Sequence, residues 1–394
     1  MDAVAPPLLK STLLDGVAGT NRNEWQSLDR GGNPFLDFDF LANLERTGCV
    51  GRSSGWTPSL VALRDEMGLA AVAPSYLKTH SYGEFVFDFA WAQAYTRFGL
   101  PYYPKLVVGA PFTPASGPRL LVRADIARDA VLRGSIEAQL VRAMAAHAEN
   151  HDISSVHVLF HRDQDRTALQ SQHWLARRDC QFHWSNHSYA DFEQFLGTFS
   201  ADKRKKAKRE RRRVTEAGIT YLTLHGGDCT PAMLDRVFAL HRETFLRHGH
   251  EPYLNRAFFT AAARDLGGAF MVKAAMLHGE MIAAAVFFVG SDTLYGRYWG
   301  AAAEFHSLHF ETCYHQGIEY CIERGLQRFE PGTQGEHKVS RGFEPTITQS
   351  SHWIADPRFR TAIADFLQRE QAAVDQYAVS MQEHVPYRDR RGET

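Results

Sequence analysis

The sequence lacks the features that mark disulfide-rich, zinc-binding and membrane-spanning proteins. Its 394 residues include five cysteines, an odd number, scattered and without a CxxC pair, which argues against a disulfide framework and a zinc site. The longest apolar run, MIAAAVFFVG, is too short to cross a bilayer. The N-terminal stretch has no basic region of the kind that opens a secretory signal. We therefore expect a cytoplasmic protein with no transmembrane segment and no metal.

An excess of charge of one sign is also missing. The 44 basic and 45 acidic residues leave a net charge of −1, so no overall field favours nucleic acid or membranes. The composition, 44% hydrophobic and 23% charged, is that of a globular protein. A chain of this length is too long for one ordinary core, so we expect two domains.

Apolar periodicity and turn residues predict the same kind of fold in both halves. In the second half they predict helices at 231–249 and 255–268, an antiparallel meander over 269–300, a helix over 308–325 and a strand after it. In the first half they predict helices at 35–48, 85–99 and 136–150, a hairpin at 59–77 and strands at 102–113 and 154–160. This order is typical of the α+β class. We place the boundary near residue 195, which gives domains 1–195 and 196–394.

The strongest local anomaly is the run KRKKAKRERRR at 203–213, with nine basic residues and one acid. A solvated helix face is one interpretation. The other is a polyanion site for phosphate, pyrophosphate or an RNA backbone, since like charges so close together disfavour an isolated helix. No aromatic residue interrupts the run, which indicates phosphate contact rather than base stacking. The candidate polyanion-binding residues are Lys203, Arg204, Lys205, Lys206, Lys208, Arg209, Arg211 and Arg212.

A second signal is TLYGRYWGAAAEF, where Arg297 precedes Gly300 and Ala302 between a strand and a helix. Small residues at such a junction expose backbone N–H groups to a pyrophosphate, although the same residues also suit a structural corner. Strand alternation predicts that Tyr295, Arg297 and Trp299 share one face, with the arginine stacked between two aromatic rings. The candidate substrate-binding residues here are Arg297, Tyr298 and Trp299, and in the following helix His309 and Glu311.

Polar residues also gather around Gly83 in LKTHSYGEFVFDFAW. Ser81 and Glu84 have the spacing of a capping box, which would make them structural. That interpretation does not account for the other polar residues of the segment, and we take Lys78, His80, Tyr82 and Asp88 as substrate-binding candidates.

The loop RFEPGTQGEHKVSRGFEP at 328–345 combines three glycines with mixed charge. A histidine flanked by a carboxylate and an ammonium has what general acid/base chemistry needs. A solvated, salt-bridged loop and a metal site at Glu330, Glu336 and His337 are the alternatives. We expect the catalytic residues to be Glu330, Glu336, His337 and Lys338, with Gln334 and Arg341 contacting substrate.

These blocks together resemble the FemAB-like proteins of peptidoglycan biosynthesis and recognition, from about residue 20 to about residue 387. The resemblance implies two GNAT-like domains facing one another, each a mostly antiparallel mixed sheet flanked by helices. The related Fem-type enzymes move an amino acid from aminoacyl-tRNA to a peptidoglycan precursor, without a metal or a covalent intermediate. Their helical-hairpin arm has no counterpart here, because residues 214–268 leave room only for two ordinary helices.

The sequence therefore predicts an acyl- or aminoacyltransferase that acylates an amine, with no tightly bound cofactor. The donor would be aminoacyl-tRNA, held in part by residues 203–213, or an acyl-CoA; the acceptor would be a peptidoglycan precursor or another small molecule. Glu336 or His337 would act as the base, and Lys338 or Arg341 would hold the oxyanion or a substrate phosphate. The alternatives are an acetyl-CoA-dependent GNAT acetyltransferase using residues 297–302, and a non-catalytic module that binds a cell-wall precursor or RNA.

Overall fold

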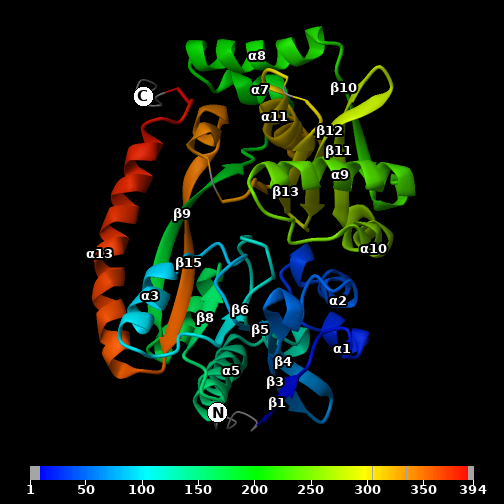
Figure 1. Cartoon of the computed structure of the whole chain (residues 1–394). Coiled ribbons are helices and arrows are strands. Elements are labelled where there is room, and N and C mark those ends of the chain that lie inside the picture. The colour runs from blue at the N-terminus through cyan, green and yellow to red at the C-terminus, as the bar shows by residue number, and fades with distance from the viewer. Residues whose placement is uncertain (1–8, 304, 334, 389–394) are drawn as a thin grey trace. The chain divides into compact units, whose positions relative to one another are not determined.

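The computed structural model describes residues 9–303, 305–333 and 335–388. The chain forms two compact units (Figure 1): unit 1 contains residues up to 179 together with 348–374, and unit 2 contains 180–347 together with 375 to the C-terminus. The units are therefore not the contiguous halves that the sequence predicted. Strand β15 (Glu344–Ile354) and helix α13 (Pro357–Gln382) bring the chain back, because residues 350–354 of β15 pair with β8 of unit 1.

Unit 1 is built on two sheets. The first has the strand order β1 (Lys10–Leu14), β3 (Leu60–Asp65), β4 (Gly68–Ala73) and β7 (Leu121–Val122), all antiparallel. In the second, β15 is followed by β8 (Ser155–Leu159), β6 (Lys105–Val108), β5 (Ser75–Lys78) and β2 (Trp56–Pro58), and only β6 and β8 are parallel. The helices of this unit are α1 (Arg22–Gln26), α2 (Phe38–Arg46), α3 (Phe89–Arg97), α4 (Ala124–Ala127), α5 (Ala130–Asn150), α6 (Asp163–Ser171) and the first part of α13, with 3-10 turns η1 (Pro34–Leu36) and η2 (Arg52–Ser54).

Helix α5 forms the core of unit 1. Asp129 caps its N-terminus by accepting hydrogen bonds from the backbone N–H groups of Val131 and Leu132. Ile136, Leu140 and Met144 recur at helical spacing and are fully buried in one cluster with strand residues of both sheets.

Unit 2 is built on one sheet. Its strand order is β10 (Thr220–His225), β11 (Phe270–Leu277), β12 (Glu280–Val289), β13 (Thr293–Ala301), β14 (Arg328–Glu330) and β9 (Leu175–Ser185), and only β13 and β14 are parallel. The helices are α7 (Phe192–Gly197), α8 (Ala201–Glu216), α9 (Pro231–Arg247), α10 (Arg256–Leu266), α11 (Leu308–Phe310), the π-helical turn η5 (Glu311–His315) and α12 (Gln316–Arg324), with 3-10 turns η3 (Gly226–Asp228), η4 (Gly267–Ala269) and η6 (Glu336–Arg341).

The α+β class, the meander β11–β12–β13 and the helical region after it are confirmed. Gly325 ends α12 in the left-handed region, at φ 67°, as the sequence predicted. Gly300 lets α9 pack directly on β13, because a Cβ there would lie 2.2 Å from the carbonyl carbon of Leu240. Within the described ranges, no helix is both long and apolar enough to cross a membrane.

The capping box at Ser81 and Glu84 is wrong. Helix α3 begins only at Phe89, and both side chains contact Lys105 of β6 instead, at 2.8 Å each. The buried ammonium of Lys105 needs hydrogen-bond acceptors, and Ser81 and Glu84 supply them instead of capping a helix.

Candidate functional site

The site in unit 2 starts at a bulge in β13. The pairing of β12 with β13 shifts between Val286, opposite Tyr298, and Phe287, opposite Gly296, so Arg297 is the extra residue at this shift. A bulge re-aims the extra side chain, and the predicted alternation of Tyr295, Arg297 and Trp299 is therefore wrong. The guanidinium carbon of Arg297 lies 5.5 Å from the centre of the Tyr298 ring, which is not one of the two rings, Tyr295 and Trp299, that were predicted to share its face.

A small cavity of about 160 Å³ opens beside this bulge. It is lined by consecutive residues of β13, by β12 and by the helical segment after β13: Ala285, Val286, Phe287, Gly296, Arg297, Tyr298, Trp299, His309, Cys313, Tyr314 and Pro331. With about 30 Å³ for each water of the bulk liquid, the cavity has room for only a small group. Among the described residues of this wall, Arg297 is the only charged one.

A second cavity of about 770 Å³ shares Trp299 and His309 with the first. Its described wall contains Thr244, Arg247, His248, Trp299, Ala301, Ala303, Phe305, His306, Leu308 and His309. One arginine and three histidines lie among these residues, and none of them is acidic. The small cavity, with Arg297 in its described wall, therefore lies next to a larger cavity lined by basic and aromatic groups.

The loop at 331–341 adjoins the small cavity through Pro331, which lines it; His337 and Lys338 are not among the described residues of the wall. Gly335 has φ 111°, and a Cβ there would meet the His337 ring at 2.3 Å, so only glycine lets the loop fold against this histidine. His337 Nε2 lies 2.8 Å from the Tyr314 hydroxyl. The Lys338 ammonium donates a hydrogen bond to the Gly332 carbonyl at 2.7 Å, and Lys338 is 2% exposed.

Burial sets the protonation of these groups. The pKa of Lys338 falls from 10.5 to about 7, mainly because of burial; Cys313 acts in the opposite direction, and the charge of Arg297 contributes to the lowering. Burial, with the charges of His337, Arg341 and Lys338, lowers the pKa of His309 to about 4. The pKa of His337 is also lowered, by burial and then by Lys338 and Arg341. Neutral imidazoles therefore lie close to a lysine that exchanges its proton near pH 7.

Cys313 packs against the core of unit 2 and also lines the small cavity. Burial raises the pKa of its thiol, so it stays protonated and is a poor nucleophile. Tyr314 was not a sequence candidate. Its hydroxyl, whose pKa burial raises, is a neutral hydrogen-bonding group beside His337.

The remaining candidates of the loop lie in different places. Glu336 is exposed, and its carboxylate accepts a hydrogen bond from the Tyr377 hydroxyl at 2.9 Å. Glu330 is buried at the end of β14, and its charge raises the pKa of Arg297, against the larger lowering that burial causes. Gln334 lies outside the described residues. The geometry thus favours His337 over Glu336 as the base.

Arg341 and Glu311 do not face either cavity. The Arg341 guanidinium forms a double hydrogen bond with Glu210 of α8, at 2.7 and 3.1 Å. Glu311 contacts Arg211 at 3.2 Å and accepts a hydrogen bond from Gln316 at 2.8 Å. Their assignment as substrate contacts is wrong, because each is occupied by a neighbour inside the fold.

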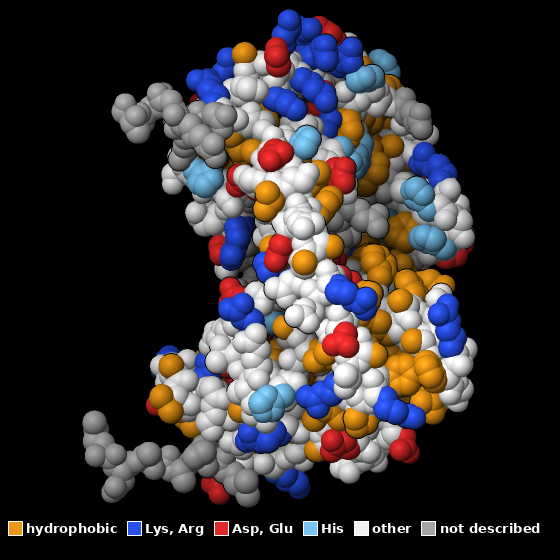
Figure 2. All heavy atoms as spheres, turned by 90° about the vertical axis from the view of Figure 1, so that its left-hand side faces the viewer, with side chains coloured by type: hydrophobic (Ala, Val, Ile, Leu, Met, Phe, Trp, Pro, Cys, Tyr) orange, Lys and Arg blue, Asp and Glu red, His pale blue; other side chains and the backbone are white. Residues whose placement is uncertain are grey.

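The basic run at 203–213 forms most of helix α8. Its inner face packs through Ala207, Glu210 and Val214, and Figure 2 shows Lys and Arg side chains gathered over this helix. Arg211 is the exception: it contacts Glu319 at 2.8 Å and lies 4.3 Å from the centre of the Phe192 ring, so its assignment to the polyanion face is wrong. The exposed basic residues are Lys205, Lys206, Lys208, Arg209, Arg212 and Arg213, with Lys203 and Arg204 half-buried.

Lys208 and Arg212 each pair with an exposed carboxylate, Glu193 and Glu216 respectively. Exposed pairs of this kind are weak and exchange readily. The outer face of α8 therefore stays a row of basic groups along about three turns of helix.

The unit 1 candidates form a buried ionic cluster. Lys105 is fully buried and contacts Asp88 and, at 2.8 Å, Glu84. Lys78 lies 4.0 Å from Glu84 and 4.0 Å from the centre of the Trp56 ring. Lys78 and Asp88 are therefore held inside unit 1 and do not face solvent, which contradicts their assignment as substrate contacts.

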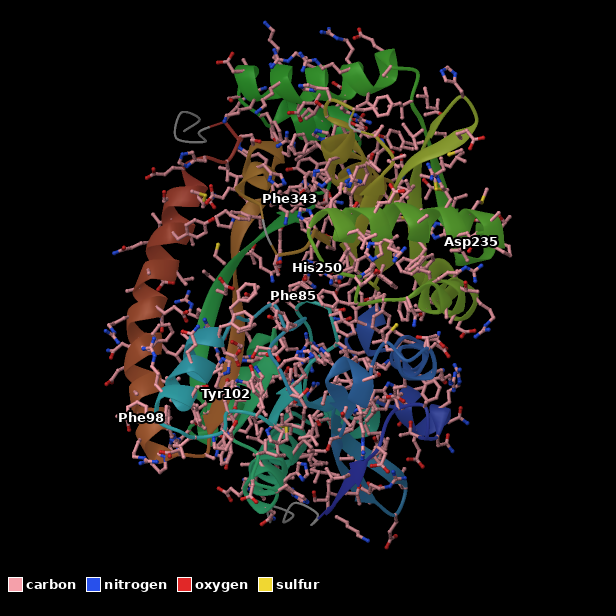
Figure 3. All side chains as sticks on the ribbon, viewed as in Figure 1. Phe85, Phe98, Tyr102, Asp235, His250 and Phe343 are labelled. Atoms are coloured by element: carbon pink, nitrogen blue, oxygen red, sulfur yellow. The ribbon has the colours of Figure 1, made fainter. Side chains whose placement is uncertain are left out.

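Two further contacts complete this cluster. Asp88 accepts a hydrogen bond from the hydroxyl of Tyr102, which lies inside unit 1 next to α3 (Figure 3). The backbone carbonyl of Tyr82 accepts one from Lys78 at 3.2 Å, and His80 Nδ1 is 3.4 Å from the same ammonium. The Tyr82 ring itself is 64% exposed, so of these four candidates it is the most accessible.

One motif escaped the sequence analysis. The stretch GRSSG at 51–55 matches the letters of the GxSxG pattern of serine hydrolases. The structure gives a 3-10 turn, η2, followed by β2, whereas a nucleophile elbow needs a strand before the serine and a helix after it. The match is a coincidence of letters.

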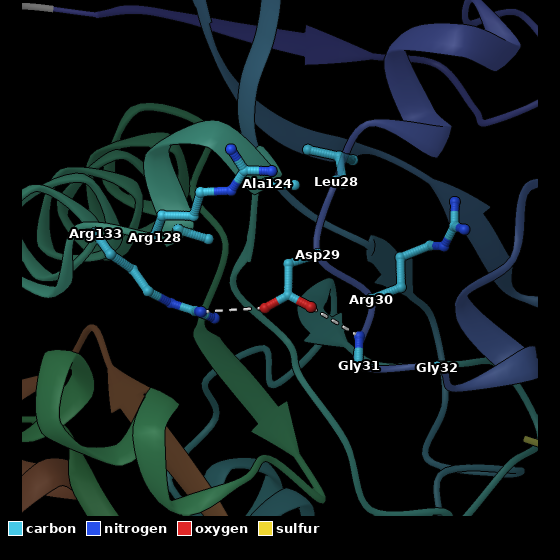
Figure 4. A pocket seen from close by; sticks show the side chains of 9 residues that line it. Leu28, Asp29, Arg30, Gly31, Gly32, Ala124, Arg128 and Arg133 are labelled. Carbon is cyan, nitrogen blue, oxygen red and sulfur yellow. Dashed lines mark hydrogen bonds and ion pairs between the residues drawn. The ribbon is translucent and has the colours of Figure 1, made fainter. Parts of the chain in front are cut away.

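A surface pocket of about 440 Å³ in unit 1 is lined by Leu28, Asp29, Arg30, Gly31, Gly32, Ala124, Ala127, Arg128 and Arg133. The Asp29 carboxylate stands between Arg133, at 3.1 Å, and the Gly31 backbone N–H, at 3.0 Å (Figure 4). Arg30 in turn lies 3.8 Å from Asp37. Because carboxylates already balance the positive charges of Arg30 and Arg133, we assign no ligand to this pocket.

Among the residues that the structure describes, no group of three or more His, Cys, Asp or Glu side chains could hold a metal ion. A metal centre at Glu330, Glu336 and His337 thus has no support in the geometry.

Comparison with known proteins gives the following matches. Residues 16–389 match the FemAB-like family, described as peptidoglycan biosynthesis/recognition. No curated protein matches the chain. Among solved structures, FemX is 10% identical, with a TM-score of 0.54 over 90% of this chain and 100% of FemX. L-PGS from Bacillus licheniformis is 10% identical, with a TM-score of 0.51 over 86% of this chain and 94% of that one.

A third structure is the C-terminal domain of a protein from Agrobacterium fabrum described as a lysylphosphatidylglycerol synthetase. It is 9% identical, with a TM-score of 0.53 over 87% of this chain and 95% of that domain. At these identities the similarities show a shared fold that extends over both units.

Proposed function

This chain belongs to the FemAB-like family, and on that premise we propose that it is an acyltransferase that moves an acyl or aminoacyl group onto an amine. The observation that carries the proposal is the small cavity of unit 2. The one charged residue in its described wall is Arg297, and the charge of Arg297 acts on Lys338, whose pKa is about 7. A small chamber with two cations beside it suits a reaction in which negative charge develops on a carbonyl oxygen.

The proposed reaction has two steps. A neutral acceptor amine attacks the carbonyl carbon of an ester or thioester, forming the new C–N bond and a tetrahedral oxyanion. The oxyanion then collapses, and the C–O or C–S bond to the carrier breaks. No residue of the protein is acylated, which agrees with the protonated state of the Cys313 thiol.

His337 and Lys338 would handle the proton in this reaction. Neutral His337, next to the Tyr314 hydroxyl, would accept the proton that the amine loses. Lys338 in its ammonium form would stabilise the oxyanion together with Arg297, and would donate a proton to the leaving oxygen or sulfur. A lysine whose pKa lies near neutrality can release and regain that proton at working pH.

The larger cavity would hold the carrier of the acyl group. Its described wall has basic residues and no acid, and the Trp299 and Phe305 rings lie in the same wall. These groups suit a ligand that combines phosphate with a flat ring, which is the chemistry of both coenzyme A and the end of an RNA. The exposed row of α8 would then add contacts to an RNA backbone and none to coenzyme A.

The description of the family and the fold shared with FemX favour an aminoacyl donor and a peptidoglycan-precursor acceptor. The β13 bulge and the adjoining cavity keep an acyl-CoA as the second candidate donor.

Thermal unfolding against a ligand panel tests the choice. The panel contains coenzyme A, acetyl-coenzyme A, charged and uncharged tRNA, and a UDP-linked muropeptide. A ligand at a hundred times its Kd stabilises the folded state by about 2.7 kcal/mol. Stabilisation by tRNA or muropeptide supports an aminoacyl donor with a peptidoglycan-precursor acceptor. Stabilisation by coenzyme A supports an acyl-CoA donor.

Turnover with the ligands that bind completes the test. Lys338→Ala and His337→Ala should each lower kcat, and Glu336→Gln should leave it nearly unchanged because that carboxylate contacts Tyr377 at the surface. Full activity of all three variants would mean that this loop is not the active site. Binding with no turnover in the wild-type protein would instead indicate a recognition module.

A further inference from the structure

Glu210 is the only acid in the basic run of α8, and it does not face solvent as its neighbours do. It is 6% exposed and accepts two hydrogen bonds from the Arg341 guanidinium, from Nη2 at 2.7 Å and from Nε at 3.1 Å. Its other close neighbour is His315 Nε2, at 3.5 Å. A double charge-assisted bond of this kind fixes the plane of the guanidinium.

Arg341 in turn holds the loop that carries His337 and Lys338. Its Nη1 donates to the His337 carbonyl at 2.6 Å and to the Ser340 hydroxyl at 3.1 Å. Its guanidinium carbon lies 3.4 Å from the centre of the Phe310 ring, next to the His309 that lines both cavities. One side chain therefore connects α8, the loop and the segment between β13 and α12.

We infer that Glu210 is a positioning residue for the active site: through Arg341 it fixes the backbone at His337 and balances the cation behind it. This inference rests on the proposed function. It also gives the basic run a second role, since its outer face presents cations to solvent and its inner face holds the catalytic loop.

An ion pair with only a structural role would stabilise the fold and leave the pKa of His337 unchanged. The charges around His337 show why a positioning role would change this pKa. His337 faces the cations Lys338 and Arg341 on its own loop, the Tyr314 hydroxyl from η5 and the neutral His309 ring from α11; the adjacent Glu336 points to Tyr377. Arg341 lowers the pKa of His337, and the carboxylate of Glu210 is the group that offsets Arg341. Without that carboxylate, the full charge of Arg341 would act on His337.

The test compares Glu210→Gln with Glu216→Gln, a matched change on the same helix at an exposed pair with Arg212. NMR titration of the His337 ring needs no substrate. We expect its pKa to fall by about half a unit or more in Glu210→Gln and to stay unchanged in Glu216→Gln. Glu210→Asp keeps the charge and should return the pKa close to the wild-type value.

Steady-state kinetics of the same variants give the second readout. We expect kcat to fall about 10- to 100-fold in Glu210→Gln, the size of effect that a displacement of about 1 Å at a catalytic group produces, with a much smaller change in KM. An unchanged His337 pKa together with unchanged kcat would overturn the inference, even if the melting temperature falls.

If Glu210→Gln does not fold, Arg341→Lys keeps a cation but loses the double bond to Glu210. The inference then requires a lowered kcat in that variant, and full activity would overturn it. A wild-type protein inactive with every donor would overturn the proposed function alone, because the His337 titration still reports whether Glu210 controls the loop.

Discussion

Replacing Lys338 by methionine should make the protein more stable and less active. Lys338 is 2% exposed, and within the described part of the chain no carboxylate forms an ion pair with it. Its one hydrogen bond there is to the Gly332 carbonyl, at 2.7 Å. A buried ammonium without a counter-ion is costly, whereas methionine fills nearly the same volume without a charge.

The size and the pH dependence of the effect follow from the shifted pKa. Since Lys338 has a pKa of about 7 in the folded protein against 10.5 ordinarily, the unfolded chain binds the proton more tightly between these values. The folded state is therefore penalised most at low pH, and it regains stability as the pH rises from about 7 towards 10.5. The linkage relation gives a penalty of about 5 kcal/mol at pH 6 and about 2 kcal/mol at pH 9.

The lost hydrogen bond to Gly332 offsets about 1 kcal/mol of the gain. Lys338→Met should thus be more stable than the wild-type protein by about 4 kcal/mol at pH 6 and by about 1 kcal/mol at pH 9. Urea unfolding at both pH values measures this difference. Lys205→Met, at an exposed position of α8, is the control and should show little change at either pH.

Two results would refute this reasoning. A Lys338→Met variant that is less stable than the wild type at pH 6 would show that the ammonium has favourable partners. A gain of equal size at pH 6 and pH 9 would show that the effect comes from packing and not from the proton. In either case Lys338 would lose the physical basis for its proposed acid/base role.

Four other changes test separate parts of the structure. Arg297→Lys keeps the charge but not the planar guanidinium, and should lower kcat/KM at least about tenfold, measured by turnover; a silent substitution would remove Arg297 from the site. Gly300→Ala places a Cβ 2.2 Å from the Leu240 backbone and should destabilise by about 3 kcal/mol in urea, whereas Gly197→Ala, which meets nothing within 4 Å, is its control. The double change Lys205→Glu with Lys206→Glu should weaken RNA binding and lower the slope of log K against log salt by about 2; an unchanged slope would exclude the outer face of α8 as the RNA contact. Lys105→Met leaves Glu84 and Asp88 buried without their shared cation and should destabilise by about 3–5 kcal/mol at pH 7, opposite in sign to Lys338→Met.

Local patterns in the sequence predicted the secondary structure well where each element is defined by its own residues. The meander over 269–300 follows from three apolar runs and two turns, and all three strands are present. Helix α8 forms in spite of its like charges, because the residues of its inner face, such as Ala207 and Val214, are buried against the rest of unit 2. Tertiary packing has here outweighed an unfavourable local charge pattern.

The parts of the site that depend on pairing between distant elements were not predictable from one sequence. Glu210 and Arg341 are 131 residues apart in the chain, and nothing in either neighbourhood indicates that they meet. Lys105 lies in the apolar strand KLVV and carried no signal of its own. The bulge at Arg297 has a similar origin, because it depends on the register of β12 against β13.

Lys105 of unit 1 and Lys338 of unit 2 are both deeply buried, and their surroundings give them different roles. Lys105 contacts two carboxylates, which raise its pKa against the opposing effect of burial, so it stays charged at every physiological pH and serves to hold the segment that carries Glu84 and Asp88. Burial and the charge of Arg297 both lower the pKa of Lys338. Arg297 lines the cavity that has room for a small group. The ion pairs of Lys105 thus offset the cost of burying its charge. Lys338 instead costs stability but can change its protonation state near neutral pH, and an acyl-transfer site requires this property.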